Sequence, residues 1–241
     1  VASRSEDAGG DAGDAVLLSG CYNNSAYVRD AAGAELAELS GHTGAVKGVA
    51  WLPGGGDGVG AMRAVSASKD STLRVWTADR GNASGYKSVT LAGRQRHREH
   101  VCAVAVINNS NIISSSRDGD LKLWKQESID ADWRCYKTDT RFSNSYPTCI
   151  TYGAGNYKNN IIAGMHQWNA FYVYDTNLTC ETLIKRSPHY ENKDVNLAVD
   201  SRDGTVVSGS HDGIVKIHKG DHYSWRENKE FQVGHGDRST Q

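Results

Sequence analysis

Five segments of the chain repeat one pattern at intervals of 45 to 49 residues, and this period limits the fold more than any other feature. Each segment has a small residue at the same point of a short apolar stretch: Ser19, Ser66, Ser114, Ala163 and Ser208. A unit of this length is one supersecondary element that cannot bury its apolar face alone. We therefore expect the units to stack against one another.

The segment 41–77 shows the pattern most completely. Its stretches 46–52, 63–68 and 72–76 combine β-branched and small residues with the alternation of a half-buried strand. Lys69, Asp70 and Ser71 separate the last two stretches and are typical of a tight turn. Helical periodicity is hard to find anywhere in the chain, so the sequence predicts an all-β fold.

The same polar residue types accompany the strands of several repeats. The complete sets, one in the second repeat and one in the third, are His42, Ser66, Asp70, Trp76 and His97, Ser114, Asp118, Trp124. The fifth repeat keeps Ser208 and Asp212 and has His218 in the tryptophan position. In the first repeat Asn23 and Arg29 replace the aspartate and the tryptophan, and in the fourth Tyr174 replaces the tryptophan.

A Gly-His pair, a serine four residues before an aspartate and a tryptophan six residues after it resemble the WD40 repeat. The resemblance implies a β-propeller of about five four-stranded blades, closed or nearly closed, in a single domain. The blades would span approximately residues 1–41, 42–93, 94–140, 141–188 and 189–241. It also implies that the aspartate, histidine, serine and tryptophan form a chain of buried hydrogen bonds, so we interpret them as structural rather than catalytic.

The two ends of the chain bear on closure of the predicted ring. Residues 1–3 lie about as far before Ser19 as Val49 lies before Ser66, so they are expected to belong to an inner strand. Residues 236–241 would have to complete that strand, although they are polar and poor in β-branched residues. We favour a closed monomer. The alternative is an open ring whose strand edges pair between two molecules.

Charge and cysteine usage exclude several classes of function. Lys and Arg number 27 against 28 Asp and Glu, so bulk charge gives no reason to expect a nucleic-acid partner. No apolar run reaches the length needed to cross a membrane. The five cysteines have no zinc-type spacing and indicate reduced thiols, which predicts a cytoplasmic or nuclear protein. No phosphate-binding loop or metal set is found, so we expect neither a cofactor nor enzymatic activity.

The composition of the chain changes near residues 93–97. Residues 1–93 contain 17 Ala, 3 Asn and no Ile, whereas residues 94–241 contain 7 Ala, 12 Asn and 10 Ile. The first part resembles ribosome-assembly WD-repeat proteins, in LSGHTGAVKGVAWL and SASKDSTLRVW. The second resembles the N-terminal propeller of the phospholipase-activating, ubiquitin-binding family, in IISSSRDGDLKLW and TVVSGSHDGIVKI. We therefore hypothesise a chimera with its junction at this point.

The residues before the aspartate position point to the central mouth of the propeller in WD40 proteins. The candidates for partner binding are Tyr22, Lys69, Arg117, His166 and His211, with Trp168 close by and Arg98 in a neighbouring basic loop. Aromatic and cationic side chains dominate the energetics of protein interfaces. The sequence thus favours a scaffold that binds a protein or peptide, including a ubiquitin-like one, on its narrow face. The alternatives are an engineered or chimeric propeller without a native partner and a ribosome-assembly factor.

Overall fold

The computed structural model describes residues 2–4, 16–53, 62–78, 85–91, 95–128, 130–142, 145–153, 160–166, 170–185, 195–199, 205–210, 214–221 and 224–232. In these residues it contains β-strands and no helix, and hence no helix that could cross a membrane. The strands form five antiparallel sheets of four, each a simple up-and-down meander. The predicted all-β class with five four-stranded sheets is confirmed.

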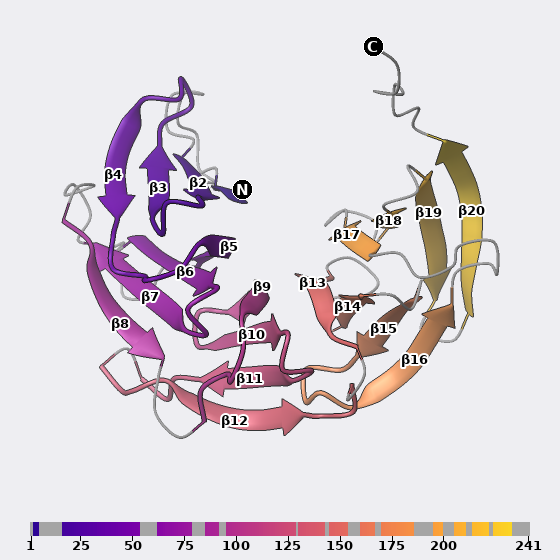
Figure 1. Cartoon of the computed structure of the whole chain (residues 1–241). Helices are drawn as coiled ribbons and strands as arrows, with labels where there is room; N and C mark the ends of the chain where they lie inside the picture. Colours follow the sequence, from indigo (N-terminus) through magenta and orange to yellow (C-terminus); the bar gives the residue numbers. More distant parts are fainter. Residues whose placement is uncertain are drawn as a thin grey trace, which may run out of the picture. The chain divides into compact units, whose positions relative to one another are not determined.

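The chain divides into two compact units, Val1–Asn144 and Ser145–Gln241. The first unit holds three sheets (Figure 1). Their strands are β1 (Ala2–Arg4), β2 (Val16–Gly20), β3 (Ala26–Arg29) and β4 (Glu35–Leu39); β5 (Val46–Leu52), β6 (Met62–Ser68), β7 (Leu73–Ala78) and β8 (Lys87–Leu91); β9 (Val101–Asn108), β10 (Asn111–Ser116), β11 (Leu121–Lys125) and β12 (Arg134–Asp139). The prediction of a single domain stays a prediction.

The second unit holds the remaining two sheets. Their strands are β13 (Pro147–Tyr152), β14 (Ile161–Met165), β15 (Ala170–Tyr174) and β16 (Cys180–Lys185); β17 (Val195–Val199), β18 (Val206–Ser210), β19 (Ile214–Asp221) and β20 (Ser224–Gln232). The inner strands β13 and β17 contact each other. Phe171 of the fourth sheet meets the ring of His218 of the fifth edge to face, with 5.0 Å between the ring centroids.

Strand register aligns the serine position of four sheets with the residue eight places later, whereas Ala163 of the fourth sheet pairs with Tyr172, nine places later. In the second sheet Ser66 pairs with Arg74 of β7, and in the third Ser114 pairs with Lys122 of β11. In the first sheet Ala2 pairs with Leu18, just as Ala50 pairs with Val65 in the second. The three residues of β1 therefore form an inner strand, as predicted for the start of the chain. Residues 236–241 lie outside the described residues, and closure of the ring stays a prediction.

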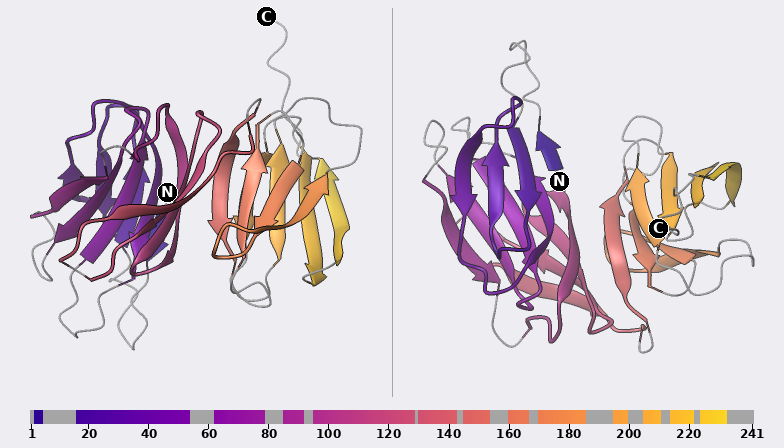
Figure 2. Two further views of the ribbon diagram at one scale, coloured as in Figure 1. Left: turned by 90° about the horizontal axis from the view of Figure 1, so that it is seen from below. Right: turned by 45° about the horizontal axis from the view of Figure 1, so that its top comes forward.

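The sheets of the first unit stack face to face, with apolar side chains between them (Figure 2). Trp76 packs with Leu18 and Val28 of the first sheet, and Trp124 packs with Val65 and Val75 of the second. Each tryptophan thus fills the space between its own sheet and the preceding one. Burying side chains of this size is the main source of stability for such stacked sheets.

Gly48 lets two inner strands of the first unit come unusually close. A Cβ atom at this position would lie 3.2 Å from the backbone atoms Cα of Ala103 and N of Val104. Backbone atoms cannot move aside as the end of a flexible side chain can, so only glycine fits without a shift of β9. The close approach brings the neighbouring residues Lys47 and Cys102 to the same end of β5 and β9.

Candidate functional site

The third sheet contains the predicted chain of polar contacts in full. Asp118 and the Nδ1 atom of His97 lie 3.1 Å apart, and the His97 Nε2 atom lies 2.8 Å from Ser114 Oγ. The indole N–H of Trp124 donates to the same oxygen over 2.8 Å. Because a carboxylate only accepts hydrogen bonds, His97 carries a proton on Nδ1 and donates to Asp118. The loop, the turn and two strands are thereby tied together inside one sheet.

The second sheet repeats this arrangement. His42 Nδ1 lies 2.8 Å from Asp70, His42 Nε2 lies 2.8 Å from Ser66 Oγ, and Trp76 donates to that oxygen over 2.8 Å. Asp70 also accepts from the backbone N–H groups of Thr43 and Thr72. The same four residue types are thus linked by polar contacts in both complete repeats.

Two degenerate repeats keep the contact to serine with a different nitrogen-bearing side chain. In the first sheet the Arg29 guanidinium donates to Ser19 Oγ over 3.0 Å. In the fifth sheet His218 Nε2 lies 2.8 Å from Ser208 Oγ. In the fourth sheet Ala163 occupies the serine position and is fully buried. Asp212, predicted to complete the set of the fifth repeat, lies outside the described residues.

These polar sets have the geometry of structural networks. Ser66 and Ser114 are buried, and each oxygen is shared between an imidazole and an indole nitrogen. A catalytic serine instead needs an oxygen that can reach its substrate. Within the described part of the chain, no group of three or more histidine, cysteine or acidic residues could hold a metal ion.

The hydrogen bonds also set the protonation of the two aspartates. Burial alone would raise the pKa of Asp118, but contacts with His97 and with two backbone N–H groups outweigh burial and hold it well below its usual range. The pKa of Asp70 is likewise lowered, because hydrogen bonds from Thr72 and Thr43 outweigh the effect of burial. Both carboxylates are therefore ionised in the folded protein at neutral pH.

The pKa of His42 is also lowered, but for a histidine this favours the neutral form. Burial lowers the pKa of the imidazole, although the Asp70 carboxylate partly offsets this effect. A lowered pKa keeps the ring neutral, so Nε2 can accept a hydrogen bond from the Ser66 hydroxyl while Nδ1 donates to Asp70.

We expect the stability of the first unit to fall as the pH is lowered from 8. A histidine with a lowered pKa contributes fully above about pH 6.5 and loses its contribution below it, and aspartates with lowered pKa values lose theirs below about pH 4. The measurement is the urea midpoint at pH 8, 7, 6, 5, 4, 3 and 2. The Asp70→Asn variant should show a smaller loss below pH 4. A midpoint that stays constant between pH 8 and pH 4 would contradict this assignment.

Three of the predicted binding residues occupy the same position in the same kind of turn. Tyr22, Lys69 and Arg117 each follow a strand by one or two residues, and the residue two places later has a left-handed backbone: Asn24 (φ 74°), Ser71 (φ 69°) and Gly119 (φ 84°). A turn ending in a left-handed residue is a common three-residue hairpin connection. We call the end of the first unit that bears these three turns the turn face.

Tyr22 and Lys69 are brought together on the turn face, along with Lys47, which the sequence analysis did not identify. The Tyr22 side chain is 71% exposed. The ammonium groups of Lys47 and Lys69 each lie 5.0 Å from the centroid of its ring. The Lys47 ammonium also lies 3.4 Å from the phenol oxygen. This hydrogen bond and the two positive charges lower the pKa of Tyr22.

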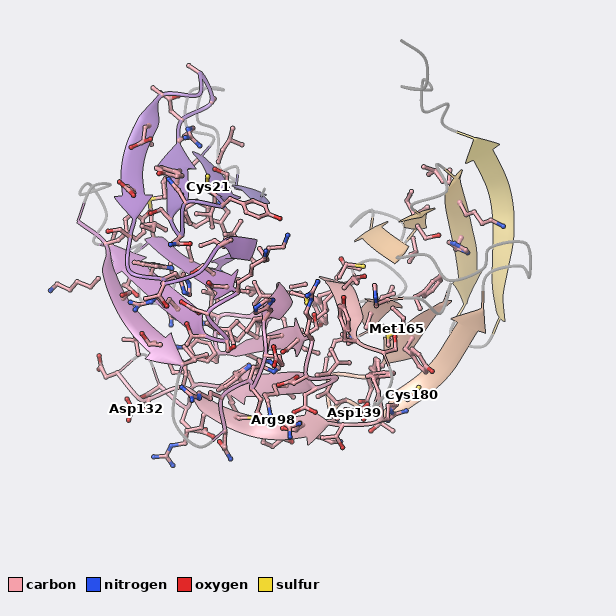
Figure 3. All side chains as sticks on the ribbon, viewed as in Figure 1. Cys21, Arg98, Asp132, Asp139, Met165 and Cys180 are labelled. Atoms are coloured by element: carbon pink, nitrogen blue, oxygen red, sulfur yellow. The ribbon has the colours of Figure 1, made fainter. Side chains whose placement is uncertain are left out.

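The other predicted binding residues have different surroundings. The Arg98 guanidinium lies 3.7 Å from Asp120, the residue that precedes β11, and the side chain lies over the outer part of the third sheet (Figure 3). His166 belongs to the second unit, where its ring stacks on Tyr146 with 4.4 Å between centroids. Trp168 and His211 lie outside the described residues.

Comparison with known sequences agrees with the repeat assignment. The family described as "WD domain, G-beta repeat" matches residues 33–77 and 90–125. Ribosome biogenesis protein YTM1 of Candida glabrata is 30% identical over 121 residues, which cover 45% of this chain and 25% of that protein. A ribosome biogenesis protein WDR12 homolog of Ixodes scapularis is 30% identical over 122 residues, covering 50% of this chain and 28% of that protein. The predicted resemblance to ribosome-assembly WD-repeat proteins is confirmed.

A third relative has a different name. Protein transport protein SEC13 of Chaetomium thermophilum is 32% identical over 101 residues, which cover 42% of this chain and 30% of that protein. The matched regions thus make up only 25–30% of the length of these three relatives.

Comparison with solved structures concerns the fold alone. The WD40 beta propeller domain of Doa1 aligns with a TM-score of 0.63 and 22% identity, covering 84% of this chain and 60% of that one. U3-55K aligns with a TM-score of 0.67 and 19% identity, covering 91% and 64%. Together with the buried Asp-His-Ser-Trp networks, these matches show that the chain contains WD40 repeats and has the fold of WD40 β-propellers.

Proposed function

We propose that the chain is a non-catalytic scaffold that binds a protein or peptide through exposed residues of the turn face. The observation that carries this proposal is that neighbouring residues of one turn have different roles. In the second and third repeats the aspartate is hydrogen-bonded to a buried histidine, while the residue before it is half-buried (Lys69) or exposed (Arg117). A repeated turn of this kind can vary its exposed residue without loss of the fold, which is how a scaffold acquires a binding surface.

Tyr22, Lys69 and Arg117 are the residues proposed to contact the partner in the first unit. Tyrosine and arginine are among the residue types that contribute most to protein interfaces. His166, Trp168 and His211 are proposed to contribute equivalent positions in the fourth and fifth repeats, and Arg98 a further charge. The proposed site needs no metal or cofactor, and the protein is proposed to work as a cytoplasmic or nuclear monomer.

A role in ribosome assembly is the second candidate, and the relatives favour it. Two of the similar proteins are named as ribosome biogenesis proteins. Binding of a ubiquitin-like partner is a narrower form of the scaffold proposal. The change of composition near residues 93–97 supports a further alternative, a chimeric chain without a native partner. A native gene that encodes all 241 residues in one reading frame would exclude the chimera.

The test compares affinity capture from a nuclear extract by the unmodified chain and by the double variant Tyr22→Ala/Arg117→Ala. We expect the double variant to lose at least about tenfold in captured partner, because it removes two side chains of the kinds that dominate interfaces. Purified ubiquitin serves as a defined probe in the same experiment. Sedimentation of the captured proteins with pre-ribosomal particles would favour the ribosome-assembly candidate.

The matched control is Tyr136→Ala on β12. Tyr136 is 58% exposed, so this variant also removes an exposed tyrosine, but from an outer strand. The control should capture as much as the unmodified chain, and all three proteins should melt at the same temperature. Equal capture by the double variant would place the binding surface elsewhere.

A further inference from the structure

Two lysines of the second sheet hold their charges against one exposed aromatic ring. Lys47 and Lys69 lie at the start of β5 and in the turn after β6, and both ammonium groups lie 5.0 Å from the Tyr22 ring centroid. Among the described residues, neither forms an ion pair with a carboxylate. Two like charges near one ring repel each other, and an anion placed between them would relieve that repulsion.

The positive region continues onto the third sheet. Gly48 allows β5 to approach β9, which brings Lys47 close to Cys102. The charges of Lys47 and Arg117 both act on the Cys102 thiol and favour its ionised form, although burial dominates and raises its pKa to about 11. Lys47 is therefore a common neighbour of Tyr22 on one side and Cys102 on the other. We call Tyr22, Lys47 and Lys69 the cationic cluster.

The aspartates of the neighbouring turns already accept hydrogen bonds from other groups. Asp70 and Asp118 belong to the same turns as Lys69 and Arg117, but their oxygens accept hydrogen bonds from the histidines and from backbone N–H groups. Their negative charges reduce the positive potential near the lysines, but their oxygens already accept hydrogen bonds from other groups. An external carboxylate can therefore still gain charge-assisted hydrogen bonds from the two ammonium groups.

We propose that the cationic cluster binds an acidic peptide segment of the partner, with its carboxylates placed between Lys47 and Lys69. This rests on the proposed scaffold function and names the chemistry of its partner. The observations favour a peptide over a nucleic acid. The Tyr22 ring is already in contact with two lysines, so stacking a base on it would displace them. The net charge of −1 also gives the chain no overall attraction for a phosphate backbone.

The test measures fluorescence anisotropy of a fluorescein-labelled octaglutamate peptide titrated with the full chain. The variant is Lys47→Gln/Lys69→Gln, and the matched control is Lys87→Gln, which removes an exposed lysine from the outer strand β8. We expect the double variant to bind about tenfold more weakly and the control to bind like the unmodified chain. Binding should also weaken as salt is raised from 50 to 200 mM, as exposed charge contacts are screened.

Two further arms make the result decisive. The charge-conserving variant Lys47→Arg/Lys69→Arg should restore binding, which excludes misfolding as the cause of a loss. An octaglutamine peptide should not bind, and an octauridylate RNA should bind more weakly than octaglutamate. Equal binding of octaglutamine, an equal loss in the Lys87→Gln control, or tighter binding of the RNA would each overturn the acidic-peptide proposal.

The outcome for this proposal is separable from that of the scaffold function. If octaglutamate fails to bind while capture still depends on Tyr22 and Arg117, the scaffold function stands and the acidic specificity falls. If octaglutamate fails to bind and capture does not depend on Tyr22 and Arg117, both proposals fall.

Discussion

Replacing Asp118 with alanine is expected to lower the free energy of unfolding of the first unit by about 2–4 kcal/mol. The carboxylate accepts hydrogen bonds from His97 and from the backbone N–H groups of Arg98 and Asp120. Without it, a buried imidazole and two N–H groups lose their acceptor together. The loss should appear in urea unfolding followed by tryptophan fluorescence, as a shift of the midpoint with an unchanged slope.

Asp130→Ala provides the control for this prediction. Asp130 is an exposed aspartate in the connection between β11 and β12, so removing it should change the free energy of unfolding by no more than about 0.5 kcal/mol. If Asp118→Ala costs less than about 0.5 kcal/mol as well, the network around His97 does not stabilise the fold.

The second large effect is expected for Trp124→Ala, at about 3–5 kcal/mol. The Trp124 side chain is 1% exposed, packs between the second and third sheets and donates its N–H to Ser114. Alanine would leave a cavity and remove that donor at once. Trp124→Phe keeps an aromatic ring but loses the five-membered part of the indole with its N–H donor, so it should cost less than Trp124→Ala, about 1–3 kcal/mol. A cost below about 1 kcal/mol for Trp124→Ala would show that the neighbouring sheets do not depend on this contact.

Combining the two substitutions tests whether the network acts as a unit. Trp124 and Asp118 do not touch, but both are linked to Ser114, one directly and one through His97. The double variant should therefore lose less than the sum of the single losses, by about 1 kcal/mol. Simple addition would mean that the two contacts stabilise the sheet independently.

The sequence predicted the inner part of each sheet well, because buried polar residues recur there at the same positions of the repeat. Strand β5 has the predicted bounds, and β6 begins one residue before its predicted stretch. The turn at Lys69 forms as predicted, with Ser71 in a left-handed conformation. Buried serine, histidine and aspartate need partners, so their spacing in the sequence carries information about three-dimensional contacts.

The outer strands were less visible in the sequence. The strand β12 was missed because Arg134, Tyr136 and Lys137 are exposed, which removes the alternation that marks a half-buried strand. The cationic cluster was also incomplete, since Lys47 lies inside a strand pattern and not in a turn. Its place beside Tyr22 depends on contact between two sheets, which spacing along one repeat does not encode.

A nitrogen-bearing side chain in contact with the serine is a better sequence signature of degenerate repeats than tryptophan alone. In four sheets a side-chain N–H donor or imidazole nitrogen stands ten residues after the serine, and it belongs to arginine, tryptophan, tryptophan and histidine in turn. A search that demands tryptophan recognises two of these four sheets. A search that accepts any nitrogen-bearing ring or guanidinium at that offset recognises all four. Such a rule would allow repeats to be counted in chains whose repeats are too divergent to be found by sequence identity.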